Sequence, residues 1–371
     1  MKLKTNSYKS RKILILFSLF IFIFSDLILY SEDNVERVPV HNPGYYFALG
    51  KKQLHIITHR ESLDELLKKK DLTDSEKEKY FFVKTVSDFC TNELKLSGED
   101  TYSKIYDTGK KPIAWNLTVA PSLSLKPVKW RYPVVGEFPY IGFFDKESAE
   151  KEEKTWVSKG YDTFLRPVSA FSTLGWFKDP IYSPMLNYDA GTLAEIIIHE
   201  RIHNTIFLKN QMEFNESVAE FLGSESAKYF LIKTFGKASE EYQYYMDLNS
   251  DQKLFFDFIN VCDNELSEIY LLNITTAEKL RKKDLKIKEL TGRYKELPFK
   301  NKGYSGYLER TDFNNAFIVA HKTYSTDQKI FSELFEYFNS DPVKMIEFLK
   351  TIPEKRDGYQ FIVEFLSTHQ K

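Results

Sequence analysis

The segment that decides the fold is Gly191–Gly223, which reads GTLAEIIIHERIHNTIFLKNQMEFNESVAEFLG. Thr192 and Glu195 have the spacing of a capping box, so a helix is expected to begin here. The helix should run through LAEIIIHERIHNTIFL, and its consecutive isoleucines, Ile196–Ile198, indicate a buried helix rather than a surface one. Charged side chains on such a helix need partners.

This helix contains an H-E-x-x-H motif that begins at His199 and ends at His203. Residues four positions apart share one face of a helix, so the two imidazoles can reach one tetrahedral zinc ion. Glu200 lies about 100° further round the helix. Its carboxylate would therefore lie beside the metal, where it can accept a proton from activated water as a general base.

A carboxylate in a second helix is the candidate third ligand. Glu216 follows His203 by thirteen positions, after the polar turn 209–214, and Asn215 is the expected N-cap of the helix that Glu216 begins. A helical hairpin of this length can bring Glu216 back to the two histidines. Glu220, one turn later, could hold the N–H group of a ligand histidine and fix its tautomer.

An H-E-x-x-H match by itself is a moderate signal, because charged helices carry His and Glu by accident. Three features favour a metal site here: an apolar helix, a second helix that starts with Asn-Glu at short range, and another carboxylate one turn later. The chain has only 7 histidines, so two of them in this pattern are improbable by chance. The sequence therefore predicts zinc held by His199, His203 and Glu216.

The first 31 residues have the layout of an export signal. Five cations precede an apolar run, Ile13–Phe24, and acidic sequence begins after Ser31. Because the run is short for a membrane span, we expect a signal peptide, with an uncleaved N-terminal membrane anchor as the alternative. Residues 32–371 are expected to form a single domain outside the cytoplasm, in the periplasm or on the outer face of the inner membrane.

Composition excludes several classes of protein. The 371 residues are 42% hydrophobic and 28% charged, as in an ordinary globular protein. The net charge of −1 offers no basic face for nucleic acid. Two cysteines, Cys90 and Cys262, are too few for a disulfide-dense scaffold, and the sequence leaves open whether they form one bridge.

The pattern along the chain predicts an α+β fold, in which a small mixed sheet precedes a mostly helical C-terminal half. Residues 45–110 and 190–371 read as helices. Residues 111–185 are rich in proline, β-branched and aromatic residues, which indicates short strands. The expected strands are Ile113–Val119, Trp130–Val135, Tyr140–Phe144 and Thr163–Val168, with an intervening helix over Ala149–Lys159.

Two resemblances can be read from whole strings of sequence. FNESVAEF, at 214–221, resembles the second-helix signature of the glutamate-type zincins, which include thermolysin and the zinc aminopeptidases. Residues 44–350 resemble the bacterial family of predicted aminopeptidases. The strings that carry this resemblance are GYY at 44–46, WN at 115–116, APSLSL at 120–125, PVVG at 133–136, GFFD at 142–145, AFSTLGWF at 170–177, DP at 179–180, FNNA at 313–316, and Tyr324.

The resemblance implies a zincin-like core and hydrolysis of peptide bonds. Specificity for a free amino terminus is implied only by the family's name. Two departures bear on it: the gap between the second His and the Glu is shorter than in familiar aminopeptidases, and their Gly-Ala-Met-Glu-Asn string, which binds the amine, is not found. The lipobox cysteine of many family members is not found either.

Related zincins supply a donor for the tetrahedral oxyanion from helices that follow the third ligand. Tyr324 is the candidate here, with Asn314 and Asn315 as companions. His321 is a further option, and a core tyrosine is an equally good interpretation of Tyr324.

In zincins an edge strand ahead of the active helix pairs with the substrate backbone. Gly175 would allow close approach of that backbone, while Trp176 and Phe177 could line a side-chain pocket. The alternative is a buried aromatic loop.

The predicted function is zinc-dependent hydrolysis of peptide bonds in the cell envelope, as an aminopeptidase. An envelope endopeptidase or peptidoglycan-peptide hydrolase with the same chemistry is the first alternative. A non-catalytic, zinc-stabilised envelope protein is the second, and the complete set of His199, Glu200, His203 and Glu216 argues against it.

Overall fold

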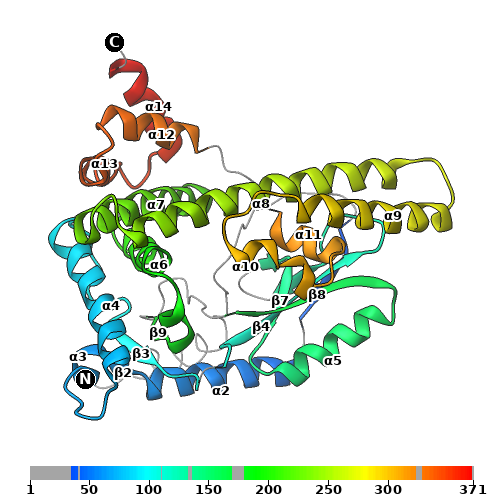
Figure 1. Cartoon of the computed structure of the whole chain (residues 1–371), viewed down its shortest axis with the longest axis horizontal. Helices are drawn as coiled ribbons and strands as arrows, with labels where there is room; N and C mark the ends of the chain where they lie inside the picture. The colour runs from blue at the N-terminus through cyan, green and yellow to red at the C-terminus, as the bar shows by residue number, and fades with distance from the viewer. Residues whose placement is uncertain are drawn as a thin grey trace, which may run out of the picture.

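The computed structural model describes residues 35–40, 42–109, 111–132, 136–168, 179–322 and 328–369, and Figure 1 shows an α+β arrangement in which helices predominate. The predicted export signal lies outside these residues. Among the described helices, none combines the length and apolar character that a bilayer span requires.

The N-terminal part is helical, as predicted. α2 (Pro43–His59) begins at Asn42, whose side chain accepts hydrogen bonds from the backbone of Gly44 and Tyr45. After β2 (Glu61–Ser62) and α3 (Leu63–Leu66), α4 (Asp74–Asn92) begins with a complete capping box between Thr73 and Glu76. Figure 1 shows α2 along one edge of the molecule and α4 rising from its end toward α6 and α7.

The described strands form three small sheets rather than one, and the four predicted strands lie in two of them. β4 (Ala114–Pro121) lies between β7 (Tyr140–Phe143) and β8 (Tyr161–Val168), antiparallel to both. A second sheet has the order β1-β5-β6, and a third has the order β2-β3-β9. Their remaining strands are β1 (Arg37–Pro39), β3 (Lys104–Tyr106), β5 (Lys129–Tyr132), β6 (Gly136–Phe138) and β9 (Ile181–Tyr182).

Two helices pack on the β7-β4-β8 sheet. α5 (Lys146–Val157) lies between β7 and β8 in the chain, where an intervening helix was predicted, and α11 (Asn315–His321) returns from much later in the sequence. The sheet and α11 share a hydrophobic cluster with the helical hairpin of α8 (Glu240–Leu271) and α9 (Thr276–Lys295). This cluster is separate from the larger core around α6.

The helix that carries H-E-x-x-H is α6 (Ala190–His203), which packs against α7 (Met212–Phe235), α4 and α8 (Figure 1). The expected capping box is wrong: the N-cap is Asp189, whose side chain accepts from the backbone of Thr192 at 3.0 Å. Gly191 permits the close approach of α8, because a Cβ at Gly191 would lie 2.3 Å from the Tyr245 ring.

The last helices, α12 (Lys329–Tyr337), α13 (Pro342–Leu349) and α14 (Gly358–His369), form a small unit beside α7. Gly358 packs directly on Phe214, with which Tyr359 makes an edge-on aromatic contact. Short turns of helix at η1 (Ser183–Asn187), α10 (Lys302–Ser305) and η2 (Leu308–Arg310) complete the described elements. Cys90 and Cys262 are buried and free, so the structure shows no bridge between them.

Candidate metal centre

The end of α6 is fixed by a buried arginine inside the H-E-x-x-H motif. Arg201 is 0% exposed, and its guanidinium group donates to the carbonyl oxygens of Leu96 and Ser97 at 2.9 and 2.6 Å. It also donates to the Thr91 hydroxyl group at 2.8 Å. These bonds join α6 to the end of α4 and to the loop that follows it.

A two-bond clamp positions the start of α7. The Asn215 amide accepts from the backbone N–H of Leu208 at 2.8 Å and donates to its carbonyl oxygen at 2.9 Å. The prediction that Asn215 caps the second helix is wrong, because α7 begins at Met212 and Asn215 lies within its first turn. The amide instead closes the connection between the two helices, which sets where Glu216 emerges.

Helices α6 and α7 approach closely beside the histidines. A Cβ at Gly223 would lie 3.4 Å from the Cβ of His199 and 3.6 Å from the carbonyl oxygen of Glu195. A Cβ at Gly223 would therefore just touch α6, so the position leaves no free space beside His199. A glycine inside a helical pattern, such as Gly223 in α7, is the signal in the sequence for such packing.

Three side chains converge where the two helices meet, as the sequence predicted. His203 Nε2 lies 3.0 Å from His199 Nε2, and Glu216 Oε2 lies 3.5 Å from His203 Nε2 and 3.7 Å from His199 Nε2. The side chains of His199, His203 and Glu216 are 24%, 19% and 37% exposed, so solvent reaches the cluster. Among the described residues, this is the group whose geometry could hold a metal ion.

The spacing of the three donor atoms fits zinc. Their separations place them on a circle of about 2.0 Å radius, and three donors of a tetrahedral zinc site with bonds of about 2.1 Å lie on a circle of nearly the same size. Two imidazoles and one carboxylate are also a common donor set of catalytic zinc sites, which keep the fourth position open. The residues present therefore fit the ion.

The electrostatics of the cluster favour a neutral His199 and an ionised Glu216, which stabilises the charged form of His203. Burial and the neighbouring His203 lower the pKa of His199 to about 4. Burial raises the pKa of Glu216, but the hydrogen bond and charge of His203 and the charge of His199 outweigh it and lower this pKa. For His203, burial lowers the pKa, but the hydrogen bond and charge of Glu216 raise it by more, so the net effect is an increase.

The residues placed beside the predicted ligands differ in their surroundings. His199 hydrogen-bonds to the backbone of Ala219, so a main-chain carbonyl group holds this ring in place. Glu220, for which that role was predicted, is exposed, and its charge acts on Glu195. Burial raises the pKa of Glu200 to about 7, His203 lowers it, and the charges of Asp179 and Glu216 raise it.

A second carboxyl group lies on α6 one turn before His199. Glu195 accepts a hydrogen bond of 2.8 Å from the Tyr245 hydroxyl group of α8, instead of closing a capping box. Burial raises the pKa of Glu195 to about 7; the bond from Tyr245 lowers this pKa and the charge of Glu220 raises it. The group helps pack α6 against α8 and does not belong to the His–His–Glu cluster.

We expect Glu195→Gln to stabilise the metal-free protein at pH 8 and to change its stability little at pH 4.5. The folded chain retains the Glu195 proton up to about pH 7, whereas the unfolded chain releases it near pH 4.5. The free energy of unfolding of the parent protein therefore falls as pH rises through this window. The gain should be on the order of 2 kcal/mol. Denaturant unfolding at the two pH values in the presence of a chelator measures it. Glu268→Gln, an exposed change on α8, is the control.

Two predicted substrate contacts have structural roles in this fold. Asn315 is 0% exposed; its amide donates to the carbonyl oxygens of Pro121 and Ser124 and accepts from the Tyr270 hydroxyl group at 2.7 Å. Asn314 caps α11 and donates to the carbonyl oxygen of Thr163. These contacts argue against a substrate contact by Asn315, because its amide is buried and occupied in holding α11 on the sheet, and the contacts of Asn314 are of the same kind.

The remaining predicted contacts are His321 and four further residues. His321 is half-buried, packs against Phe317 of α11 and is hydrogen-bonded to Tyr307, which argues against a role as oxyanion donor. Tyr324, Gly175, Trp176 and Phe177 lie outside the described residues.

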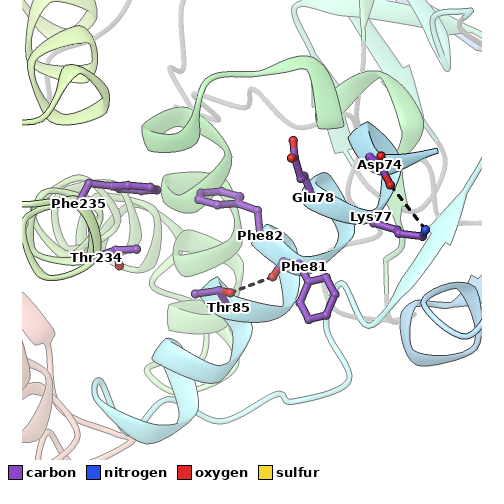
Figure 2. Close-up of a pocket in the computed structure, with 8 residues that line it drawn as sticks. All are labelled: Asp74, Lys77, Glu78, Phe81, Phe82, Thr85, Thr234 and Phe235. Atoms are coloured by element: carbon purple, nitrogen blue, oxygen red, sulfur yellow. Dashed lines mark hydrogen bonds and ion pairs between the residues drawn. The ribbon is translucent and has the colours of Figure 1, made fainter. Parts of the chain in front are cut away.

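An open groove of about 650 Å³ lies elsewhere, between α4 and the C-terminal end of α7. Figure 2 shows Phe81 and Phe82 of α4 and Phe235 of α7 around it, with the Asp74–Lys77 ion pair at one end. None of its lining residues belongs to the His–His–Glu cluster. The groove is therefore a separate surface feature.

The fold and the site together define an α+β protein with a candidate metal centre between two paired helices. The chain belongs to the family described as "Putative aminopeptidase", whose family model matches residues 44–358. That description indicates a peptidase, which acts on peptides. No curated protein and no solved structure matches the chain.

Proposed function

We propose that this chain is a zinc-dependent aminopeptidase of the glutamate-type zincin class. The observation that carries the proposal is the convergence of His199, His203 and Glu216 on one small circle, with Glu200 next to the first histidine. Membership of the aminopeptidase family supports the same activity.

The donor set assigns a role to each side chain. His199, His203 and Glu216 would hold the zinc ion. When bound, zinc lowers the pKa of a water molecule and polarises the scissile carbonyl group. Glu200 accepts the proton of the attacking water and delivers it to the leaving amine. Its carboxylate suits this exchange, because burial keeps the pKa near neutrality.

The rest of the chain makes the cluster rigid. Arg201 joins α6 to the end of α4 and the loop that follows it, and Asn215 fixes the connection to α7. Catalytic groups held by packed helices keep their geometry better than groups held by loops. We further propose that the enzyme works outside the cytoplasm, on the basis of the export signal read in residues 1–31.

A matched pair of peptides tests the proposed activity. We expect the zinc-loaded chain to release the first residue of a peptide library with free amino termini and to leave the N-acetylated library intact. Mass spectrometry of the products identifies each cleaved bond. Internal cleavage of both libraries would replace the aminopeptidase by an endopeptidase with the same chemistry. If neither library is cleaved, the proposal of a peptidase fails.

A further inference from the structure

A short loop packs tightly against the C-terminal end of α6. This 96–102 loop receives the Arg201 side chain, and the backbone N–H of Ser97 donates to the Thr205 hydroxyl group at 2.9 Å. The Asn204 amide group donates both to the Thr101 hydroxyl group, at 3.2 Å, and to the carbonyl oxygen of Glu200, at 2.7 Å. The loop is thus tied to the backbone of the residue that we assign as general base.

Tyr102 ends this loop in an unusual backbone conformation. Its φ is +57°, in the left-handed region that bulky side chains rarely adopt. The backbone N–H of Tyr102 donates to the carbonyl oxygen of Asp179 at 3.2 Å. Strained residues of this kind persist where the surrounding structure fixes them, and they are concentrated at functional sites.

The hydroxyl group of Tyr102 is buried without a partner. The residue is 2% exposed, and its hydroxyl oxygen makes no hydrogen bond within the part of the chain that the structure describes. Burial raises the pKa of Tyr102 strongly, and the charges of Glu200 and Asp179 are close enough to raise it further. A buried donor with no acceptor costs free energy, so its retention calls for an explanation.

The carboxylate of Glu200 needs a hydrogen-bond donor. It is partly exposed, and a peptide that fills the site would displace water around it. A carboxylate that loses water needs a donor, which Asp179 cannot provide when ionised. Tyr102 offers an uncommitted O–H group in the same neighbourhood.

We propose that Tyr102 is a positioning residue for Glu200: its hydroxyl group donates a hydrogen bond to the Glu200 carboxylate when a peptide occupies the site, and so fixes the direction of the base. This inference rests on the proposed function. Tyr102 acts through Glu200 and touches neither the metal ligands nor the reacting bond.

Tyr102→Phe tests the inference, because it removes the oxygen and keeps the ring. We expect kcat to fall about 10- to 100-fold and KM to stay within about twofold, with unchanged zinc content. We also expect the melting temperature to stay equal or to rise, because an unsatisfied buried hydroxyl group is removed. A merely structural tyrosine would lower stability and activity together.

Tyr182→Phe is the matched control. Tyr182 is 1% exposed, and the charged neighbours that shift its pKa are Asp179 and Arg60. This variant should keep kcat within about twofold of the parent value. A third comparison uses the Glu200→Asp variant, in which the shorter side chain moves the carboxylate away from the Tyr102 hydroxyl group. When Tyr102→Phe is added to this variant, kcat should fall by less than about threefold.

The outcomes separate two kinds of failure. An active parent enzyme whose Tyr102→Phe variant keeps kcat within twofold overturns the inference alone. A fall in kcat that comes with an equal fall in melting temperature, or that repeats in full in the Glu200→Asp background, also overturns it. A parent chain that cleaves no peptide overturns the proposed function, and the role of Tyr102 falls with it.

Discussion

Replacing Glu200 by glutamine should lower kcat by about a thousandfold or more while the protein keeps its zinc. The amide has nearly the shape of the carboxylate but cannot accept a proton, and general-base catalysis contributes about 10²- to 10⁴-fold in well-studied enzymes. The metal ligands His199, His203 and Glu216 are untouched, so zinc content should stay at the parent level.

Loss of folding cannot account for this expected result. Burial raises the pKa of Glu200 to about 7, which means that the fold disfavours its charged form. A neutral glutamine removes that cost, so the variant should be at least as stable as the parent at pH 8. Thermal unfolding at this pH and stopped assays with free-amine peptides together separate stability from catalysis.

Glu195→Gln is the matched control for Glu200→Gln. Both changes neutralise a carboxyl group on α6 whose pKa burial raises to about 7. Because Glu195 is bonded to Tyr245 and lies outside the cluster, its variant should keep kcat within a few-fold of the parent value. If Glu200→Gln kept the parent kcat, or if both variants lost activity equally, Glu200 would not be the base.

Glu216→Gln should weaken zinc binding on the order of a thousandfold. Structural zinc sites bind with about 10–16 kcal/mol shared among their ligands, so the loss of one charged ligand removes roughly 3–4 kcal/mol. The carboxylate also balances His203, whose pKa its hydrogen bond and charge raise against the effect of burial. Competition with a chromophoric chelator at fixed pH measures the affinity of each variant.

Glu213→Gln provides the control for zinc binding. Glu213 is an exposed residue of the first turn of α7, one turn before Glu216, so the change alters helix charge without touching the cluster. Its affinity for zinc should match that of the parent chain. Equal affinities for the Glu216→Gln and parent proteins would remove Glu216 from the ligand set.

The candidate site could be predicted because its residues are close in sequence and helical periodicity is regular. Two histidines four positions apart must share a face, and a hairpin of thirteen residues leaves few places for Glu216. The strands β4, β7 and β8 could likewise be predicted from β-branched and aromatic residues between prolines. The structural predictions that succeeded rest on short-range sequence patterns, whereas the family prediction rests on the resemblance of whole strings.

The predictions that failed, or that the observed contacts argue against, concern side chains that can make either of two equally good sets of hydrogen bonds. Glu195 fits a capping box and also fits a bond to Tyr245, which lies fifty positions away, and only tertiary packing decides between them. Asn215 fits an N-cap but clamps Leu208. Asn315 stands in a string that resembles a functional motif, yet its amide holds α11 on the sheet. Tyr102 could not be predicted, because no sequence motif indicates a buried phenol group in a left-handed backbone conformation.

Diffraction at the zinc absorption edge, on crystals of the zinc-loaded protein, tests the central claim most directly. The account predicts one anomalous peak per chain, within about 2.0–2.2 Å of His199 Nε2, His203 Nε2 and a Glu216 carboxylate oxygen. A peak bound by other side chains, or a Glu216 carboxylate turned away from the two imidazoles, would contradict it.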